Sequence, residues 1–325
     1  MAHEIDFTTG KAAMAYVGET PWHGLGQKME AGKTIDEWKY AAGMNFSLES
    51  KDVLFETNDG NILTVPDRKV LVRSDNQKAL GVVSRNYKVV QPGEVLEFYR
   101  DLTESAGFQM ETAGVLRDGR KYWALANMGQ EAKVLDDTIK GYLLLGTACD
   151  GSMSTVAMFT SIRVVCNNTL TFAVEGTGAN KGQRIVRINH RSNFNETKVK
   201  AQLGLAATSW DSFIKSVDVW SKTKVNNDQA ENFFSTVSTY TNEKGDQVVS
   251  TKTVDALFDL YQGRGMGSDL EAARKTVWGL INAVTEHVDH HRGRTDDVRI
   301  DRAWFGDGQT TKELAVNLAN QLVAA

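Results

Sequence analysis

The periodicity of the apolar residues changes near residues 189–195, and this change constrains the fold more than any other feature of the sequence. Before it, short runs rich in Val, Ile, Leu and aromatic residues alternate with turn clusters such as Asn58-Asp59-Gly60, which is the pattern of β-strands. After it, apolar residues recur every three or four positions, as at Ala206, Trp210 and Val217, which is the pattern of amphipathic helices. Strands followed by helices predict an α+β protein.

Asp118-Gly119 and Asp150-Gly151 each predict a tight turn, because glycine tolerates the positive φ that hairpin turns require. Apolar runs flank both turns. The first part of the chain, residues 1–190, is therefore expected to be an antiparallel β-rich core with hairpins and one or two helices. Residues 191–325 are expected to be a helical region, which either forms a separate domain or packs back on the core. The two predicted hairpins are Phe108–Leu116 with Lys121–Met128, and Tyr142–Cys149 with Ser154–Thr160.

Two capping boxes, in which a hydroxyl and an acidic side chain satisfy reciprocal backbone donors, predict helix starts. Thr34 and Glu37 open a short helix that runs to Ala42, and Ser268 and Glu271 open a longer one. The other predicted strands are Phe46–Phe55, Lys69–Arg73, Leu80–Ser84 and Tyr87–Val90, and the predicted helices include Gly93–Glu104, Asp228–Tyr240, Val254–Tyr261, Asp269–His291 and Lys312–Val323.

The composition is that of a globular protein, with 41% apolar and 24% charged residues in a chain of 325. No apolar run approaches 18 residues, so we expect no membrane span. Residues Met1–Gly10 lack the basic and then apolar pattern of a signal peptide, and we therefore expect a cytoplasmic protein of a bacterial host. The two cysteines, Cys149 and Cys166, are expected to be reduced thiols.

Positive charge is concentrated between Ser161 and Lys200, where seven basic and two acidic residues give +5 in a chain of net charge −4. Such a strip is typical of a surface that binds a polyanion, since arginine side chains pair with phosphate groups. The alternative is a solvated linker whose arginines pair with acids elsewhere. The predicted nucleic-acid-binding residues are Arg163, Lys181, Arg184, Arg187 and Arg191. The candidate aromatic residues for stacking on bases are Tyr87, Tyr122, Trp123 and Phe159, although we expect most of these four to lie in the core.

A histidine-rich stretch near the C-terminus offers a different kind of site. His287 and His291 are four residues apart on a predicted helix, a spacing that can bind a metal ion. No cysteine pair lies near them, and an ideal helix places both on the same stripe as the apolar Val284, with Asp289 nearly opposite. Buried, hydrogen-bonded histidines at the C-terminus of a helix are the interpretation that we favour, because the helix dipole attracts them there, and a contact with nucleic acid or phosphate is the next alternative. We therefore predict no metal and no cofactor. An enzyme remains the second hypothesis, and its site would unite His23, His287, Asp289, His290 and His291.

Several stretches together resemble the phage/plasmid-like protein family that is catalogued as a domain of unknown function of the DUF932 type. The resemblance covers nearly the full length and implies a phage, prophage or plasmid origin, with no activity attached to it. Its stretches are Gly18–Gly26 (GETPWHGLG), Gly81–Gln91 (GVVSRNYKVVQ), Ser161–Leu170 (SIRVVCNNTL), Asn282–Arg292 (NAVTEHVDHHR), and Phe305–Gly308 with Lys312.

The order of the predicted strands and helix between Tyr87 and Leu170 is also similar to the β-rich core of single-strand annealing proteins of the Redβ, RecT and Erf type. This likeness is one of element order, without a shared motif. It implies a homo-oligomer that holds single-stranded DNA in a basic groove. We therefore expect a non-enzymatic phage protein that binds single-stranded nucleic acid during recombination or annealing. A phage structural protein, or one that interacts with host defence, is the third hypothesis.

Overall fold

The computed structural model describes residues 5–18, 24–163, 165, 169–171, 185–195, 197–199, 206–292 and 299–324. The chain divides into two compact units, each built from several stretches of sequence. Unit 1 comprises Met1–Gly129, Tyr142–Phe159 and Gly176–Leu205, and unit 2 comprises Gln130–Gly141, Thr160–Glu175 and Ala206–Ala325.

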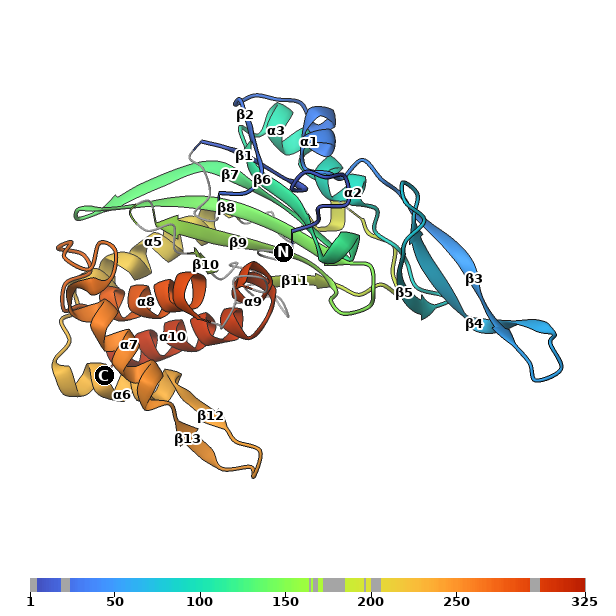
Figure 1. Ribbon diagram of the computed structural model, residues 1–325. Coiled ribbons are helices and arrows are strands. Elements are labelled where there is room, and N and C mark those ends of the chain that lie inside the picture. The colour runs from blue at the N-terminus through green and yellow to red at the C-terminus, as the bar shows by residue number, and fades with distance from the viewer. Residues whose placement is uncertain are drawn as a thin grey trace. The chain divides into compact units, whose positions relative to one another are not determined.

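Strands dominate the first half of the chain and helices the second, so the prediction of a mixed α+β protein with a β-rich N-terminal half is confirmed (Figure 1). The strands are β1 (Met14–Val17), β2 (Gln27–Met29), β3 (Leu48–Glu56), β4 (Ile62–Arg73), β5 (Ala79–Ser84), β6 (Gln109–Leu116), β7 (Lys121–Val134), β8 (Asp137–Ala148), β9 (Thr155–Arg163), β10 (Thr169–Thr171), β11 (Ile185–Ile188), β12 (Thr239–Thr241) and β13 (Gln247–Val249). The helices are α1 (Ile35–Ala41), α2 (Pro92–Glu97), α3 (Arg100–Ser105), α5 (Ala206–Lys222), α6 (Asn227–Val237), α7 (Thr251–Asp259), α8 (Val277–Glu286), α9 (Arg299–Phe305) and α10 (Asp307–Ala324), with π-helical turns η4 (Leu260–Arg264) and η5 (His287–His291).

The largest sheet has eight strands, in the order β10-β9-β8-β7-β6-β1-β2, and β11 pairs with β9 beside β10. A second sheet has the order β3-β4-β5, and β12 pairs with β13 in a short hairpin. Both predicted hairpins are confirmed. In the first, Leu116 pairs with Lys121 across the turn, and Asp118 and Gly119 adopt φ values of 58° and 105°. Gly119 also has no room for a side chain, because a Cβ atom there would lie 2.8 Å from Nη1 of Arg73.

The core of unit 1 forms where α2 and the segment that follows it pack on the central strands. Phe98, Tyr99, Tyr122 and Trp123 are almost completely buried. The Tyr99 hydroxyl lies 2.9 Å from the carbonyl oxygen of Ala124 and 3.0 Å from that of Leu143, so it is satisfied inside the core. Burying four aromatic side chains supplies a large part of the hydrophobic stabilisation of a domain of this size.

One arginine is buried in unit 1 and is fully paired. The Arg73 side chain is only 1% exposed, and its guanidinium donates to Asp6 at 2.6 Å, to Asp75 at 2.8 Å and to the carbonyl oxygen of Asp118 at 3.0 Å. The same group lies over the ring of Phe46, 3.9 Å from its centroid. A buried charge is tolerated when hydrogen bonds replace its hydration, and this arginine joins the end of β4 to the N-terminal segment.

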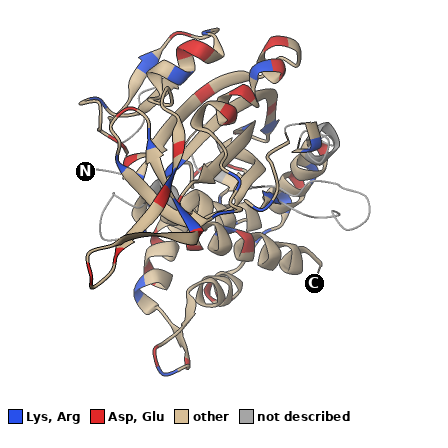
Figure 2. Cartoon of the chain, turned by 90° about the vertical axis from the view of Figure 1, so that its right-hand side faces the viewer, with Lys and Arg blue, Asp and Glu red and all other residues tan. Residues whose placement is uncertain are grey.

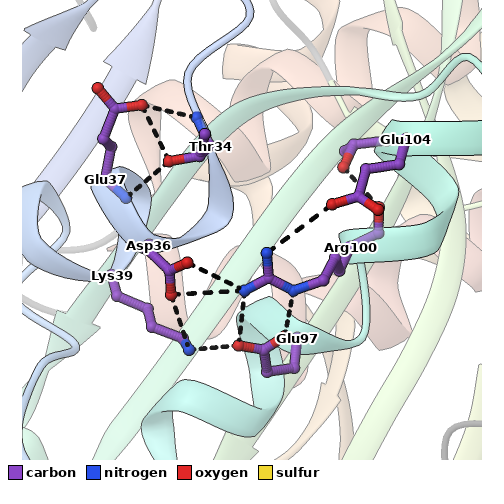
Figure 3. Close-up of polar contacts among 8 residues, drawn as sticks. Thr34, Asp36, Glu37, Lys39, Glu97, Arg100 and Glu104 are labelled. Atoms are coloured by element: carbon purple, nitrogen blue, oxygen red, sulfur yellow. Dashed lines mark hydrogen bonds and ion pairs between the residues drawn. The ribbon is translucent and has the colours of Figure 1, made fainter.

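A network of ion pairs connects α1 with α2 and α3 on the surface of unit 1 (Figure 3). Arg100 donates to both carboxylate oxygens of Glu97, at 2.6 and 3.0 Å, and also reaches Asp36 at 3.3 Å. Lys39 of α1 donates to Glu97 as well. The predicted capping box at the start of α1 is confirmed beside it, with the Glu37 carboxylate accepting from the backbone N–H and the hydroxyl of Thr34.

Unit 2 is organised around α8, whose ten residues are all buried. Trp278 stacks on Trp220 of α5, with ring centroids 6.1 Å apart and an interplanar angle of 12°. Its indole N–H donates to the carboxylate of Asp137 at 2.9 Å. Gly279 is required at this point, because a Cβ atom would lie 2.0 Å from the carbonyl oxygen of Ala273. The helices α8 and α10 lie side by side (Figure 1).

Several predicted elements are wrong in extent or type. Residues 87–90 form no strand; their backbone follows a turn at residues 85–86 and leads into α2. The helix predicted over Gly93–Glu104 is interrupted at residues 98–99 and becomes α2 and α3. The helix predicted to reach Tyr240 ends at Val237, and Tyr240 belongs to β12.

The second predicted capping box does not form. Ser268 donates its hydroxyl proton to the carbonyl oxygen of Gly265, and the helix begins only after Thr276, whose hydroxyl accepts from the N–H of Gly279. The physical reason is a distant competitor, since the Asp136 carboxylate accepts from the backbone N–H groups of residues 271 and 272 at 2.8 and 3.1 Å. No helix among the described residues is long and apolar enough to cross a membrane.

Candidate nucleic-acid interface

The predicted basic residues fall partly within the described regions of unit 1. Arg187 in β11 and Arg191 in the loop after it are both exposed. Lys181 and Arg184 lie outside the described residues, and for Arg163 the structure describes the backbone, which belongs to β9, but not the side chain. Whether all five predicted cations share one surface therefore remains a prediction.

Four further cations come from two segments linked to the stretch containing Arg187 and Arg191: residues 85–88 contact it through Lys88, and β4 in turn contacts residues 85–88 through Lys69. Arg68 and Lys69 lie in β4, and Arg85 and Lys88 lie in the connection from β5 to α2. The backbone N–H of Lys88 donates to the carbonyl oxygen of His190 at 2.6 Å, and the Lys69 ammonium donates to the carbonyl oxygen of Tyr87 at 2.9 Å. The basic cluster of unit 1 is defined here as Arg68, Lys69, Arg85, Lys88, Arg187 and Arg191.

The cations of unit 1 differ in whether they have a carboxylate partner. Lysine and arginine residues are spread over many elements (Figure 2), but Lys33, Lys51 and Lys78 each form an ion pair with a carboxylate, at 2.9, 2.8 and 2.8 Å. Within the described part of the chain, no member of the basic cluster forms such a pair. Unneutralised cations that neighbour one another produce a positive potential that a polyanion can relieve.

The pKa of Lys69 is sensitive to the positive charge of a neighbouring member of the cluster. Burial lowers the pKa of Lys69, and the positive charge of Lys88 lowers it further. Asp67 lies next to Arg68 in sequence, yet its carboxylate forms no ion pair with any residue that the structure describes. An anionic ligand would therefore meet cations that no neighbouring side chain has already neutralised.

Lys88 and Arg191 each directly follow, in the sequence, one member of a stacked aromatic pair. The Tyr87 ring stacks on the His190 imidazole, with centroids 4.4 Å apart and an interplanar angle of 17°. The Tyr87 hydroxyl donates to the carbonyl oxygen of Ala148, and burial raises the pKa of this phenol well above its ordinary value. Tyr122, Trp123 and Phe159 are buried in the core, as expected for most of these aromatic residues, and are not available to stack on bases.

The cations of β4 and of residues 85–88 were not among the predicted binding residues, although the sequence around residues 85–88 contains a signal for them. Arg85 and Lys88 belong to the stretch GVVSRNYKVVQ, which stands out in the sequence for its resemblance to a known family. The same stretch is tightly packed, because a Cβ atom on Gly81 would lie 3.0 Å from Asp150. A basic residue inside such a stretch is a candidate for function as well as for packing.

The histidine-rich stretch of unit 2 is arranged differently from the prediction. His291, expected on the buried stripe, has a side chain that is 50% exposed, whereas Asp289, expected nearly opposite, is buried. The reason is that α8 ends in the π-helical turn η5, which shifts the residues after Glu286 from the positions of an ideal α-helix. No group of three or more potential metal ligands occurs among the described residues, and His23 lies outside them.

Two stretches that suggested the family resemblance, Asn282–Arg292 and Phe305–Gly308 with Lys312, contact each other in unit 2 through ion pairs. Lys312 pairs with Asp289 at 2.9 Å, and Arg292 donates to Asp307 at 2.9 Å and to the Thr311 hydroxyl at 2.8 Å. The buried carboxylate of Glu286 accepts from the backbone N–H of Met266. These contacts connect η5 and α10 and give the polar residues of both stretches a role in packing.

Comparison with known protein families agrees with the resemblance seen in the sequence. The model of the family described as "Domain of unknown function (DUF932)" matches residues 79–304. The chain belongs to the DUF932 family. The DUF932 match begins at β5 and ends within α9, so it includes Arg85, Lys88, Arg187 and Arg191 but not β1–β4. The comparisons found no match among curated proteins and none among solved structures.

Proposed function

We propose that this protein binds single-stranded nucleic acid through the basic cluster of unit 1, as a non-enzymatic accessory of phage DNA recombination or annealing. The observation that supports the proposal is the contrast in pairing within unit 1. Exposed cations at Lys88, Arg187 and Arg191 have no carboxylate partner among the described residues, whereas Lys33, Lys51 and Lys78 each have one.

The release of counterions gives an estimate of how much each phosphate contact contributes to the affinity. Each phosphate of a single strand that a cation neutralises releases condensed counterions, which contributes about 0.7 to the dependence of log affinity on log salt concentration. Three such contacts therefore make the affinity at 0.1 M salt about 100-fold higher than the affinity at 1 M salt. The extended segment of β11 and the loop after it offers cations at intervals along the backbone, which suits a flexible strand better than a compact ligand.

The test compares two variants that each lose three positive charges from unit 1. The first carries Lys88→Gln, Arg187→Gln and Arg191→Gln, which remove unpaired cations. The matched control carries Lys33→Gln, Lys51→Gln and Lys78→Gln, which remove cations that already have carboxylate partners. Binding to a labelled oligo-dT is measured by fluorescence anisotropy, with oligo-rU and a DNA duplex as competitors.

We expect the first variant to lose about 100-fold in affinity and the control to lose less than about threefold, since an ion-paired lysine releases few counterions. Equal losses in both variants would show that net charge alone attracts the oligonucleotide. An unchanged affinity in the first variant would remove the basic cluster as the interface.

A further inference from the structure

The imidazole ring of His190 lies between two backbone carbonyl groups in unit 1. Its Nδ1 atom is 3.0 Å from the carbonyl oxygen of Lys88, and its Nε2 atom is 3.1 Å from the carbonyl oxygen of Met153. One face of the ring stacks on Tyr87. The ring thus fastens the loop after β11 to two other segments, the connection before α2 and the connection between β8 and β9.

Hydrogen-bond chemistry decides which form of the ring fits this place. A carbonyl oxygen can only accept, and a neutral imidazole has a single N–H group. In the neutral ring, one nitrogen lone pair would therefore face a carbonyl oxygen at about 3 Å, where both atoms carry partial negative charge. Turning the ring over exchanges nitrogen for carbon and supplies no second donor. Only the protonated ring donates to both carbonyl groups, and stacking on Tyr87 adds a cation–π attraction.

We propose that His190 is a positively charged positioning residue of the basic cluster, and that binding of single-stranded nucleic acid there is coupled to the uptake of a proton by this ring. The coupling rests on the proposed function. The protonated ring holds the loop backbone against Lys88 and so fixes the place from which Arg191 presents its charge.

The charged groups around the ring determine the sign of the coupling. Its own segment carries Arg187 and Arg191, the connection before α2 carries Lys88, β4 carries Lys69, and the connection between β8 and β9 carries Asp150. Four cations against one carboxylate oppose a further positive charge in the free protein. Phosphate groups bound at the cluster would offset this repulsion and favour the protonated ring. By linkage, affinity must then rise as the pH falls.

The first test needs no nucleic acid. Long-range ¹H–¹⁵N correlation spectra of protein labelled at histidine report whether each ring nitrogen carries a proton, and the His190 signals are assigned by their loss in His190→Gln. We expect both nitrogens of His190 to be protonated in the free protein at pH 6. A neutral tautomer at that pH would overturn the assignment of charge.

The second test measures oligo-dT binding between pH 8 and pH 6 with a dye that is insensitive to pH. Wild-type affinity is expected to rise by up to about tenfold per pH unit over the range in which the ring of the free protein loses its proton. His190→Gln, which has no group that titrates in this range, should bind with little pH dependence. His190→Lys, which keeps a permanent charge, should bind more tightly than His190→Gln and without the pH dependence.

The control is His291→Gln, which removes an exposed histidine of unit 2 and should keep the wild-type pH dependence. A pH dependence that survives in His190→Gln would overturn the coupling alone. A wild-type protein that binds no oligonucleotide at any pH would overturn the proposed function together with the coupling, while leaving the charge on His190 to be decided by the spectra.

Discussion

Lys312 and Asp289 bury opposite charges in unit 2, with side chains that are 2% and 7% exposed. Their ammonium nitrogen and carboxylate oxygen are 2.9 Å apart, so each charge replaces part of the water that the other loses. A pair of this kind contributes little net stability, but removing either partner takes away part of the compensation for the buried charge that remains.

Replacing Lys312 by Met should therefore lower the free energy of unfolding by about 3–5 kcal/mol, because the Asp289 carboxylate would remain buried without its partner. The double variant Lys312→Met, Asp289→Asn should recover most of this loss, since it removes both charges. Guanidinium denaturation followed by tryptophan fluorescence measures the difference. A single variant that costs less than about 1 kcal/mol would show that the carboxylate has other compensation.

His287 should make the stability of the protein depend on pH. Burial, and then the nearby charges of His291 and Arg292, lower the pKa of His287 to about 4. Its Nδ1 atom is buried and has no hydrogen-bond partner among the residues of known placement. Between the ordinary pKa of about 6.5 and the folded value, the unfolded chain binds the proton more readily.

The free energy of unfolding should accordingly fall as the pH is lowered from about 6.5 towards 4, and His287→Gln should show a weaker dependence over that range. Urea denaturation at half-unit pH intervals gives the comparison. His291→Gln should weaken the dependence only in part, because it removes one of the charges that lower the pKa of His287. Parallel curves for wild type and His287→Gln would contradict a buried neutral imidazole.

The three helices α1, α2 and α3 are held together by the ion pairs around Arg100 and Glu97 (Figure 3). Hydrogen bonding from Arg100, helped by Lys39 and opposed by partial burial, lowers the pKa of Glu97 to about 2. The contribution of this carboxylate to stability is therefore complete above its ordinary pKa and is lost as the pH falls towards 2.

Substituting Glu97 by Gln should reduce stability by a constant amount above about pH 5, and the gap to wild type should close between about pH 4.5 and pH 2. Thermal unfolding from pH 2 to pH 7 at low ionic strength measures this difference in stability between wild type and Glu97→Gln. Added salt should narrow the gap as well, because a third of the Glu97 side chain is exposed and its pairs are screened. A gap that persists at pH 2 would mean that the pairing charge is not its cause.

Local signals in the sequence were sufficient for some elements and insufficient for others. The capping box at Thr34 and the turn at Asp118-Gly119 depend on residues within a few positions, and both were predicted correctly. The start of α8 depends on Asp136, which is more than 130 residues distant from the N–H groups that it binds. No local pattern around Ser268 could have revealed that competition.

Part of the candidate interface was predicted from the sequence, and part of it was not. Composition identified Arg187 and Arg191, because positive charge is concentrated in their part of the chain. Lys88 joins them through a contact with His190 across 102 residues, which requires the pairing of β11 with β9 and the packing of the loop that follows. Periodicity and charge counts contain no information about such long-range contacts.

The two units of the chain are interleaved in sequence, and unit 2 depends on a short stretch that precedes its helices. Gln130–Gly141 supplies Asp136, which binds the N–H groups of residues 271 and 272, and Asp137, which accepts from Trp278. Gly141 is also in close contact with Trp210.

A fragment of residues 206–325 should therefore fail to fold cooperatively, because the Trp278 N–H and the turn before α8 would lose their partners. Near-ultraviolet circular dichroism during thermal unfolding tests this, with the full-length chain as reference. A sharp unfolding transition in the fragment would show that α5–α10 need no support from residues 130–141.

The unpaired cations of unit 1 are proposed to neutralise the phosphates of a single strand, and the salt dependence of oligo-dT binding measures that neutralisation. If all six members of the basic cluster make contacts, log affinity should fall with log NaCl concentration with a slope of about −4. The slope should be about −2 after Lys88→Gln, Arg187→Gln and Arg191→Gln, and should stay near −4 in the control that lacks Lys33, Lys51 and Lys78. A slope near zero, or one slope shared by all three proteins, would contradict the claim.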